Sequence, residues 1–371
     1  MAKLGEVCKV SPSTKNIERQ GAWLLNLDMV EQQTGRVIEY KYVGEDDLNG
    51  SIIQFDTENV LYSKLRPNLN KVVLPQKDGF STSELLPLRP DARVLNRDYL
   101  AVFLRSDSFV TWAVSKTAGA KMPRLGTKDL MNAEIPVPTI EQQKKIAEKF
   151  KKLEQLIFLR KQQLAKLDEL VKARFVEMFL LHDYPTKTLD ELSIGKGEYG
   201  AQSASTEYDS TRPRYVRITD VNEDGTLNDD KVSSENITDD EQYRLSYGDF
   251  MFARMGATVG KTYAFLSGNQ IFAGYLIRYK LNLSLANPRY LFWYTKLDDY
   301  QKWVKLNQSG AAQPGINAKK YGSLKIPVPP IALQNQFAAF VERVDQQKQT
   351  VQQSLEKLEL MKKALMQEYF G

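Results

Sequence analysis

The sequence has very little of two residues that build many active sites. Its 371 positions include one cysteine, Cys8, and one histidine, His182. A lone cysteine forms no disulfide within the chain, which is typical of proteins from a reducing compartment. A zinc site of cysteines and histidines needs about four ligands, so that class of site is excluded. One histidine also leaves little material for Ser-His-Asp catalysis. We interpret Cys8 as a small buried residue and His182 as a helix-end residue.

Long apolar runs are also missing. No stretch reaches the ~18 apolar residues of a membrane span, and Met1–Glu6 lacks the apolar core of a signal peptide. Hydrophobic residues make up 42% and charged residues 26%, as in an ordinary globular protein. The net charge is +5, too small an excess to indicate a nucleic-acid partner by itself. We expect a cytoplasmic protein of two or three domains.

An internal repeat is what the sequence does contain. Ile135-Pro136-Val137-Pro138 recurs as Ile326-Pro327-Val328-Pro329, so position 135 corresponds to position 326, an offset of 191. Further upstream, Val60–Leu65 matches Phe250–Met255 at an offset of 190. This period is too long for a solenoid. It predicts a tandem duplication of two related modules, each followed by its own helix.

Two segments without glycine or proline follow the repeated Ile-Pro-Val-Pro motif, at Glu141–Leu180 and Ala332–Phe370. Proline before such a segment favours a helix start there. Apolar residues alternate at spacings of three and four, which is the coiled-coil period, so two long helices are predicted to pair antiparallel. The two seams are Ile146, Phe150, Leu153, Ile157, Arg160, Leu164, Leu167, Val171, Arg174 and Met178, and Phe337, Val341, Val344, Lys348, Val351, Leu355, Leu358, Lys362, Leu365 and Tyr369.

Basic residues interrupt both seams, but at positions that are not equivalent. They are Arg160 and Arg174 in the first helix and Lys348 and Lys362 in the second. A polar seam residue can fix the register of a helix pair. A long basic side chain can instead extend from the seam edge into solvent. The sequence leaves both hypotheses open.

The remainder of each repeat is a mixture of short strands and helices. Runs rich in β-formers and bounded by turn residues occur at Asn59–Tyr62, Arg214–Ile218 and Ile271–Ile277. One or two helices are predicted within Arg97–Ser115 and within Pro288–Leu306. Each module is therefore expected to be α+β.

The predicted fold class is α+β, with two tandem homologous α+β modules separated by two long helices that pair as an antiparallel coiled coil. We expect the modules at residues 1–139 and 182–330. The long helices are expected at 140–181 and 331–371.

Two motifs resemble catalytic loops without matching them. Gly256–Thr262 is one residue shorter than a phosphate-binding loop, and its duplicate has no glycine. We interpret it as a turn that places Lys261 and Lys71 at equivalent positions. Asn287–Tyr290 resembles a methyltransferase motif, but a helix start with proline in the first turn explains it better.

A further pattern supports one alternative function. Asp28, Glu39 and Lys41 stand in the order of a nuclease site, which would make the chain a magnesium-dependent nuclease. The pattern is short and the second repeat lacks it. A second alternative is a coiled-coil adaptor whose modules bind proteins.

Basic and polar residues gather in the turns of both modules. Lysine and arginine neutralise phosphates, and arginine, asparagine and glutamine can read base edges. No catalytic residue and no metal ligand is predicted. The candidate DNA-binding residues are Lys64, Arg66, Asn68, Lys71, Lys121 and Arg124 in the first module and Arg212, Arg214, Arg217, Arg254, Lys261, Gln313, Asn317 and Lys319 in the second.

Several segments carry a resemblance to a known family. They are Asn59–Pro67, Gly119–Leu125, Gly310–Ile316 and Ile135–Pro138 with Glu141-Gln142-Gln143. In this order they resemble the DNA-specificity subunit of type I restriction-modification systems, over the whole chain. The second repeat departs from the pattern at Leu333-Gln334-Asn335-Gln336, so any specific role of Glu141 is not duplicated.

This resemblance implies a function. Each module would be a target-recognition domain for one half of a split DNA target, and the long helices would set the spacer between the halves. The helices would also dock two methyltransferase subunits, and motor-nuclease subunits would join them. The chain would be non-catalytic and without a cofactor, with S-adenosylmethionine, ATP and Mg²⁺ bound by its partners. The candidate partner-docking residues are Ile146, Phe150, Leu153, Leu164, Leu167, Phe337, Val341, Val344, Leu355 and Leu358.

Overall fold

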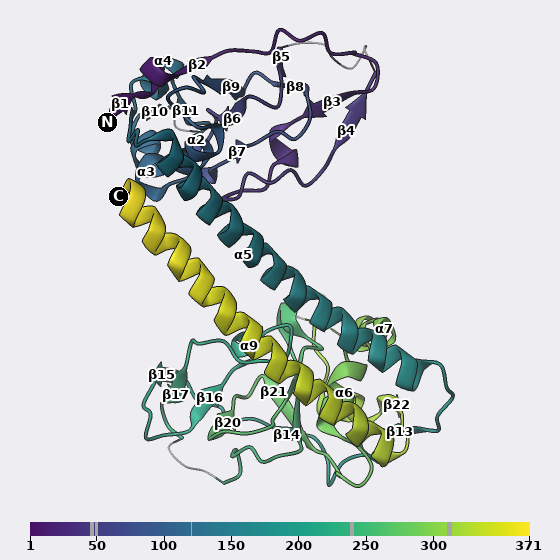
Figure 1. The fold of residues 1–371 in the computed structure, drawn as a ribbon. Coiled ribbons are helices and arrows are strands. Elements are labelled where there is room, and N and C mark those ends of the chain that lie inside the picture. Colours follow the sequence, from purple (N-terminus) through teal and green to yellow (C-terminus); the bar gives the residue numbers. More distant parts are fainter. Residues whose placement is uncertain (45–47, 49–50, 120, 238–240, 310–313) are drawn as a thin grey trace. The chain divides into compact units, whose positions relative to one another are not determined.

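The fold consists of two α+β modules and two long helices (Figure 1). This computed structural model describes all residues except 45–47, 49–50, 120, 238–240 and 310–313. The chain forms two compact units: unit 1 comprises Met1–Gln163 with Val351–Gly371, and unit 2 comprises Leu164–Thr350. Because the division between the units passes through both long helices, the expected domain limits near 139, 181 and 330 stay predictions.

The module of unit 1 is built on two four-stranded sheets. The first has the order β2-β9-β6-β7 (Cys8–Val10, Leu85–Pro90, Val60–Ser63, Val72–Val73), with antiparallel neighbours. The second has the order β4-β3-β8-β5 (Lys41–Val43, Ala22–Leu25, Gly79–Thr82, Ile52–Phe55), and its β3–β8 pair is parallel. Two short antiparallel pairs complete the module, β1–β12 (Ala2–Lys3, Glu134–Ile135) and β10–β11 (Thr117–Ala118, Arg124–Leu125).

The module of unit 2 repeats the first sheet and the parallel pair of unit 1, but its second sheet is divided into two-stranded pairs. Its four-stranded sheet has the order β14-β21-β18-β19 (Glu198–Tyr199, Leu276–Lys280, Asp249–Ala253, Thr262–Ala264). The parallel pair is β16–β20 (Arg214–Val216, Gln270–Phe272), beside the pairs β15–β17 (Ser205–Glu207, Val232–Ser234) and β13–β22 (Thr186–Thr188, Lys325–Pro327). The shared strand order agrees with the duplication predicted from the sequence.

Short helices cover each module. In unit 1 they are α1 (Leu4–Val7), α2 (Arg97–Leu104), α3 (Asp107–Ser115) and α4 (Thr127–Met131), and in unit 2 α6 (Pro288–Tyr294), α7 (Asp298–Asn307) and α8 (Ala318–Gly322). Asn96 and Asn287 cap α2 and α6, since their side chains accept hydrogen bonds from Tyr99 N (3.0 Å) and Arg289 N (2.9 Å). The Asn287–Tyr290 motif is thus a helix start.

The prediction of one strand over Ile271–Ile277 is wrong. The run is divided between β20 and β21 by a turn in which Leu276 N donates to Ala273 O (2.9 Å). Gly274 N donates to Ala201 O at 2.8 Å, and a Cβ at Gly274 would lie 3.1 Å from that carbonyl oxygen. Apolar content does not reveal such a turn because both strands and the turn itself are rich in apolar residues.

The two long helices match the predicted segments. Helix α5 runs over Ile140–Phe175 and continues as a π-helical turn, Val176–Leu180, and α9 runs over Ile331–Phe370. All residues of the two predicted seams are buried or half-buried. In unit 1, Lys149, Glu154 and Lys161 of α5 contact Tyr369, Lys362 and Glu359 of α9. The numbers rise on one helix and fall on the other, so the helices are antiparallel.

The four basic seam residues behave in two ways. Lys348 and Lys362 pair across the helices, at 2.6 Å from Asp168 Oδ1 and 2.9 Å from Glu154 Oε1. Arg160 and Arg174 bond within α5, to Gln163 (2.8 Å) and Glu177 (2.7 Å). The lysines therefore fit the register hypothesis and the arginines fit the hypothesis of a side chain at the seam edge. Each such pair contributes about 0–1 kcal/mol, so apolar packing decides the pairing.

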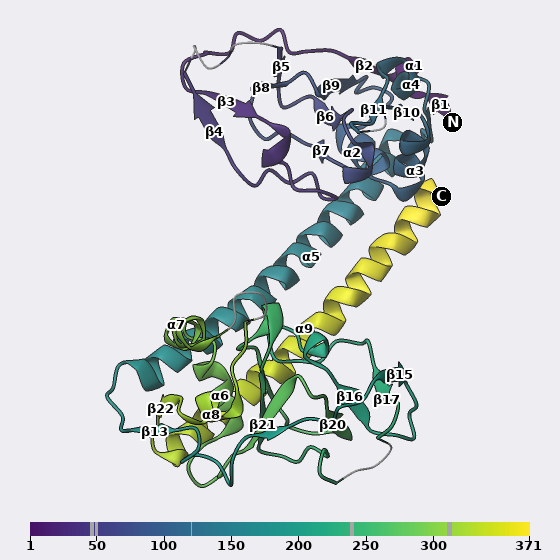
Figure 2. The ribbon, with the colours of Figure 1, turned by 180° about the vertical axis from the view of Figure 1, so that it is seen from behind.

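The aromatic end of each long helix completes the core of a module. In unit 1, the Phe370 ring lies 5.4 Å from Tyr99, 5.9 Å from Phe103 and 6.4 Å from Phe150 of α5. The C-terminal end of α9 lies beside the start of α5 (Figures 1 and 2). In unit 2, Phe179 lies 4.8 Å from Tyr290 and 5.4 Å from Phe337. Each core therefore needs the start of one long helix and the end of the other.

The two rare residues lie where the sequence indicated. Cys8 is buried in β2, and burial raises the pKa of its thiol to about 12. His182 is exposed just beyond the end of the first long helical segment. None of the helices in the described ranges is both long and apolar enough to cross a membrane.

Truncation of Phe337 should test this core. Its side chain is fully buried against Phe175, Phe179 and Trp293, so Phe337→Ala should lower the free energy of unfolding by about 3–5 kcal/mol. Guanidinium titration followed by circular dichroism measures it. Leu170→Ala, on an exposed face of α5, is the control and should change stability by no more than about 0.5 kcal/mol. Equal effects of both variants would contradict this core.

Candidate nucleic-acid interface

Two surface segments of unit 1 lie against each other at one edge of the module. They are the β6 turn, residues 63–71, and the α4 loop, residues 117–125. Leu125 N donates to Lys64 O at 2.9 Å, and Arg66 N donates to Pro123 O at 2.8 Å. These backbone bonds bring the side chains of Lys64, Arg66 and Arg124 to one surface, beside a hollow that Lys64 and Arg124 line together with Lys116, Gly119, Met122 and Asp129.

The backbone of the β6 turn is unusual. Arg66 has φ 49° and Asn70 has φ 50°, on either side of a single 3₁₀ turn, Pro67–Leu69. Non-glycine residues seldom adopt positive φ, and such residues concentrate at functional sites. Asn70 is held by its bond to Arg105 O (3.0 Å), whereas Arg66 is exposed and reaches Lys121 O at 3.4 Å. The turn is thus rigid at its base and presents a basic side chain.

Unit 2 has the same arrangement. The β18 turn, residues 253–261, meets the α8 loop, of which residues 309 and 314–316 are described. Ile316 N donates to Arg254 O and Gly256 N donates to Pro314 O, both at 2.9 Å. Arg254 therefore occupies the place that Lys64 has in unit 1.

Arg254 is held in position by an aromatic ring. Its guanidinium carbon lies 4.8 Å from the centroid of the Tyr199 ring, and Tyr199 Oη accepts a hydrogen bond from Ala318 N at 3.2 Å. A cation–π contact of this kind contributes about 0.5–1 kcal/mol at an exposed site. Asn317, which caps α8 by accepting from Lys320 N, and the exposed Lys319 follow directly.

Three predicted DNA-binding arginines lie elsewhere and support the fold of the module. Arg212 donates to Ser234 O and to Ile237 O (3.2 Å), and Arg214 donates to Asn228 O (2.8 Å). Arg217 pairs with the buried Asp220, with Nη2 2.7 Å from Oδ1, and this carboxylate raises the pKa of Arg217. These contacts tie the three side chains to their own module, although Arg212 Nε and Arg214 Nε are buried without a hydrogen-bond partner, and their assignment to DNA contacts stays a prediction.

The two equivalent lysines also point inward. Lys71 Nζ donates to Leu27 O at 2.6 Å, and burial lowers the pKa of Lys71. Lys261 Nζ lies 3.2 Å from Glu223 Oε1. Their backbone carbonyls close the turns, since Ser63 N donates to Lys71 O (3.1 Å) and Ala253 N donates to Lys261 O (2.8 Å), which agrees with the interpretation of Gly256–Thr262 as a turn.

Other predicted residues have separate outcomes. Asn68 is exposed in the β6 turn, where its carbonyl oxygen accepts from Gln33 Nε2 at 3.0 Å. Gln313, with Gly310–Ala312 and Ala120 of the family segments, lies outside the described residues. Among the residues that are described, no group of three or more His, Cys, Asp or Glu could hold a metal ion.

An exposed aromatic pair was not predicted as a site. Tyr40 and Tyr42, beside and on β4, are about half exposed, and Lys77 Nζ donates to Tyr42 Oη at 3.0 Å. In unit 2, Lys231 Nζ lies 5.7 Å from the Tyr208 ring. Exposed aromatic rings beside lysines can stack on bases and contact phosphates. The alternation Tyr40-Lys41-Tyr42 is the sequence signal for this pair, and of its three residues the nuclease alternative includes Lys41 alone.

The predicted partner-docking residues face inward. Of the ten, Phe150, Leu153, Phe337, Val341, Val344 and Leu355 are buried and Ile146, Leu164, Leu167 and Leu358 are half-buried. They hold the helices together and to the modules, and partner docking at these residues stays a prediction. The apolar side chains that the helices expose are Leu156, Leu159, Leu170, Leu360 and Met361.

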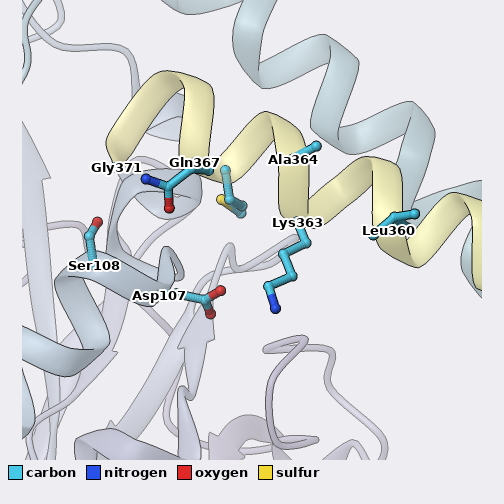
Figure 3. A pocket seen from close by; sticks show the side chains of 8 residues that line it. Asp107, Ser108, Leu360, Lys363, Ala364, Gln367 and Gly371 are labelled. Carbon is cyan, nitrogen blue, oxygen red and sulfur yellow. The ribbon is translucent and has the colours of Figure 1, made fainter.

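A hollow lies beside this exposed face at the end of α9. Figure 3 shows it between Asp107 and Ser108 of α3 and the last turns of α9, with Leu360, Lys363, Ala364 and Gln367. A partner that docks on the helices of unit 1 has this surface available to it.

Comparison with known proteins assigns the family. A family model for the type I restriction modification DNA specificity domain matches residues 1–169 and again 182–360. The chain belongs to this family. It carries two type I restriction modification DNA specificity domains, and the curated relatives that it resembles are specificity subunits. Neither the nuclease nor the adaptor alternative is supported.

Individual relatives agree with this assignment. The chain is 26% identical over 124 residues to the EcoDI type I restriction enzyme specificity subunit of Escherichia coli. The aligned segment is 33% of this chain and 27% of that protein. It is 21% identical over 322 residues to the MjaVIII specificity subunit of Methanocaldococcus jannaschii, covering 81% of this chain and 75% of that protein. The fold is similar to that of the type I restriction-modification S subunit from M. genitalium, with a TM-score of 0.63, 16% identity and coverage of 100% and 95%.

Alanine substitution of two arginines in the second specificity domain should show which of them stabilises the fold and which lies at the surface. Arg217→Ala leaves the fully buried Asp220 without its counter-ion and should lower the free energy of unfolding by about 3–5 kcal/mol. Arg254→Ala removes one cation–π contact and should lower it by no more than about 1 kcal/mol. Chemical denaturation measures both. A larger loss for Arg254→Ala would contradict the scaffold role of Arg217.

Proposed function

We propose that this chain is the specificity subunit of a type I restriction-modification complex and reads a bipartite, asymmetric DNA target, one half with each module. The observation that carries the proposal is the paired turn and loop, which recur at equivalent positions of both modules and present basic side chains. Lysine and arginine in such turns suit phosphate contacts, and arginine also suits guanine.

The side chains that the two surfaces present support the asymmetry of the target. Unit 1 has Lys64, Arg66 and Arg124, where unit 2 has Arg254, Gly256 and Gly315. Because the donors differ while the backbone bonds are shared, the two half-sites are expected to differ.

The long helices supply the spacer and the partner surface in this proposal. At 1.5 Å per residue, α5 and α9 extend for about 54 and 60 Å. Two methyltransferase subunits would dock on the exposed apolar side chains of these helices, and motor-nuclease subunits would join the complex. S-adenosylmethionine, ATP and Mg²⁺ would be bound by those partners, with no cofactor in this chain, in the cytoplasm.

The first test is the pattern of adenine methylation that the chain directs. Cells carrying the methyltransferase partner should show a split, non-palindromic methylated motif only when this chain is also expressed. Modification-sensitive sequencing with and without the chain measures it. A palindromic motif would contradict the asymmetry. No motif, with the partner shown to be expressed and bound, would contradict the specificity function.

The second test lengthens both helices together. Seven residues inserted between Gln163 and Leu164, and seven between Thr350 and Val351, keep the seam in phase and add about 10 Å to each helix. The spacer of the methylated motif should grow by about three base pairs at 3.4 Å each, with both half-sites unchanged. An insertion in α5 alone is the control and should impair helix pairing. An unchanged spacer in the double insertion would refute the role of the helices.

A further inference from the structure

Each long helix begins with a completely buried glutamine. In unit 1 this residue is Gln143, in the first turn of α5, and its side chain is 0% exposed. Its Oε1 accepts a hydrogen bond from Asn96 N at 2.7 Å, and its Nε2 donates to Val94 O (2.9 Å) and Pro138 O (2.8 Å). Both hydrogens and the oxygen of the amide are thus used, as a buried amide requires.

Gln334 makes the same three bonds in unit 2. Its side chain is also 0% exposed, at the start of α9. Its Oε1 accepts from Asn287 N at 2.9 Å, and its Nε2 donates to Leu285 O (3.0 Å) and Pro329 O (2.8 Å). Each partner stands 191 positions after its counterpart in unit 1, so the whole set of contacts is duplicated.

The neighbouring residues are not duplicated. In unit 1, Gln142 Oε1 accepts from Thr139 N and Thr139 Oγ1, both at 3.0 Å, which closes a capping box at the start of α5. Pro330 and Leu333 occupy the equivalent positions in unit 2 and offer neither group. The buried glutamine is therefore retained where the helix cap differs, which separates its role from capping.

The bonds connect three parts of each unit. Val94 and Asn96 belong to the segment that enters α2, Asn96 caps that helix, and Pro138 precedes α5. Apolar packing allows one surface to turn on another, but three hydrogen bonds that leave one amide in different directions fix a single orientation. Gln143 thus fixes the module of unit 1 on the start of its own long helix, and Gln334 does the same in unit 2.

We propose that Gln143 and Gln334 are positioning residues that fix the orientation of each module on its helix, and so the spacer length at which the two half-sites are read. The inference rests on the proposed function and adds to it a pair of residues that act on spacing without contacting DNA. According to this inference, one set of residues determines the spacer length and a different set recognises the bases.

The test uses the full chain assembled with its methyltransferase partner. A DNA library keeps both half-sites fixed and varies the spacer by up to two base pairs, and methylation is read by sequencing. The wild type should strongly prefer one spacer. Gln143→Ala and Gln334→Ala should each lower this preference by roughly fivefold or more, as expected for the loss of a net hydrogen bond, while the preferred bases stay unchanged.

Matched controls separate positioning from stability. Gln142→Ala removes the capping box and Gln336→Ala changes an exposed neighbour, and both should keep the wild-type spacer preference. Gln143→Glu keeps the acceptor for Asn96 N but places a carboxylate oxygen against the carbonyl oxygens of Val94 and Pro138, and should lose the preference at least as strongly as Gln143→Ala.

The outcomes are distinguishable. A wild-type complex without any spacer preference would overturn the proposed function. Assembled Gln143→Ala and Gln334→Ala complexes with the wild-type preference would overturn the inference alone. Failure of the alanine variants and of Gln143→Glu to assemble would assign the glutamines to folding, and so would also overturn the positioning role.

Discussion

Burial of one apolar face on each long helix is the constraint on which both units depend. A helix of about 40 residues with an apolar seam needs a partner along its whole length. In unit 1 the start of α5 packs against the end of α9, and in unit 2 the end of α5 packs against the start of α9. The ends are aromatic: Phe370 fills the core of unit 1 beside Tyr99, and Phe179 fills that of unit 2 beside Tyr290. A module is consequently complete only when segments far apart in the sequence have assembled, which links the folding of each module to the pairing of the helices.

Polar contacts then determine geometry that apolar packing leaves open. Besides the two buried glutamines, Tyr99 Oη donates to Pro136 O at 2.9 Å and Tyr290 Oη donates to Pro327 O at 2.8 Å. These bonds join α2 or α6 to the segment that leads into a long helix, and they are duplicated to within 0.1 Å. A buried hydrogen bond adds modestly to the free energy of unfolding, but a buried donor or acceptor that loses its partner lowers it by much more. The frame of each unit is therefore specified by groups that tolerate few replacements.

The sequence predicted this frame better than it predicted the contacts within it. All the seam positions that the spacing of three and four residues predicted are buried or half-buried, because burial of a helix face leaves a periodic signal, but the buried rings of Phe175, Phe179 and Phe370 were not among them. The partner of a single charged side chain leaves no such periodic signal in the sequence. Arg212, Arg214 and Arg217 were therefore predicted to be surface donors, while their partners lie up to 25 positions away. Gln143 belongs to the motif Glu141-Gln142-Gln143, but its buried role was not predicted, because a glutamine in a polar helix is expected to be solvated until its three partners are known.

The recognition surfaces follow a different physical rule from the frame. The β6 turn and the α4 loop are joined by main-chain bonds, Leu125 N to Lys64 O and Arg66 N to Pro123 O, and the same bonds join the β18 turn and the α8 loop. A main-chain bond persists when the side chain of its residue changes, so lysine at position 64 and arginine at position 254 are held equally well. Arg217 has no such freedom, because any uncharged replacement leaves the buried Asp220 without this counter-ion. Side chains can therefore vary where the backbone alone holds the surface together, and this allows two modules of one architecture to present different donors on the surfaces that we propose for DNA reading.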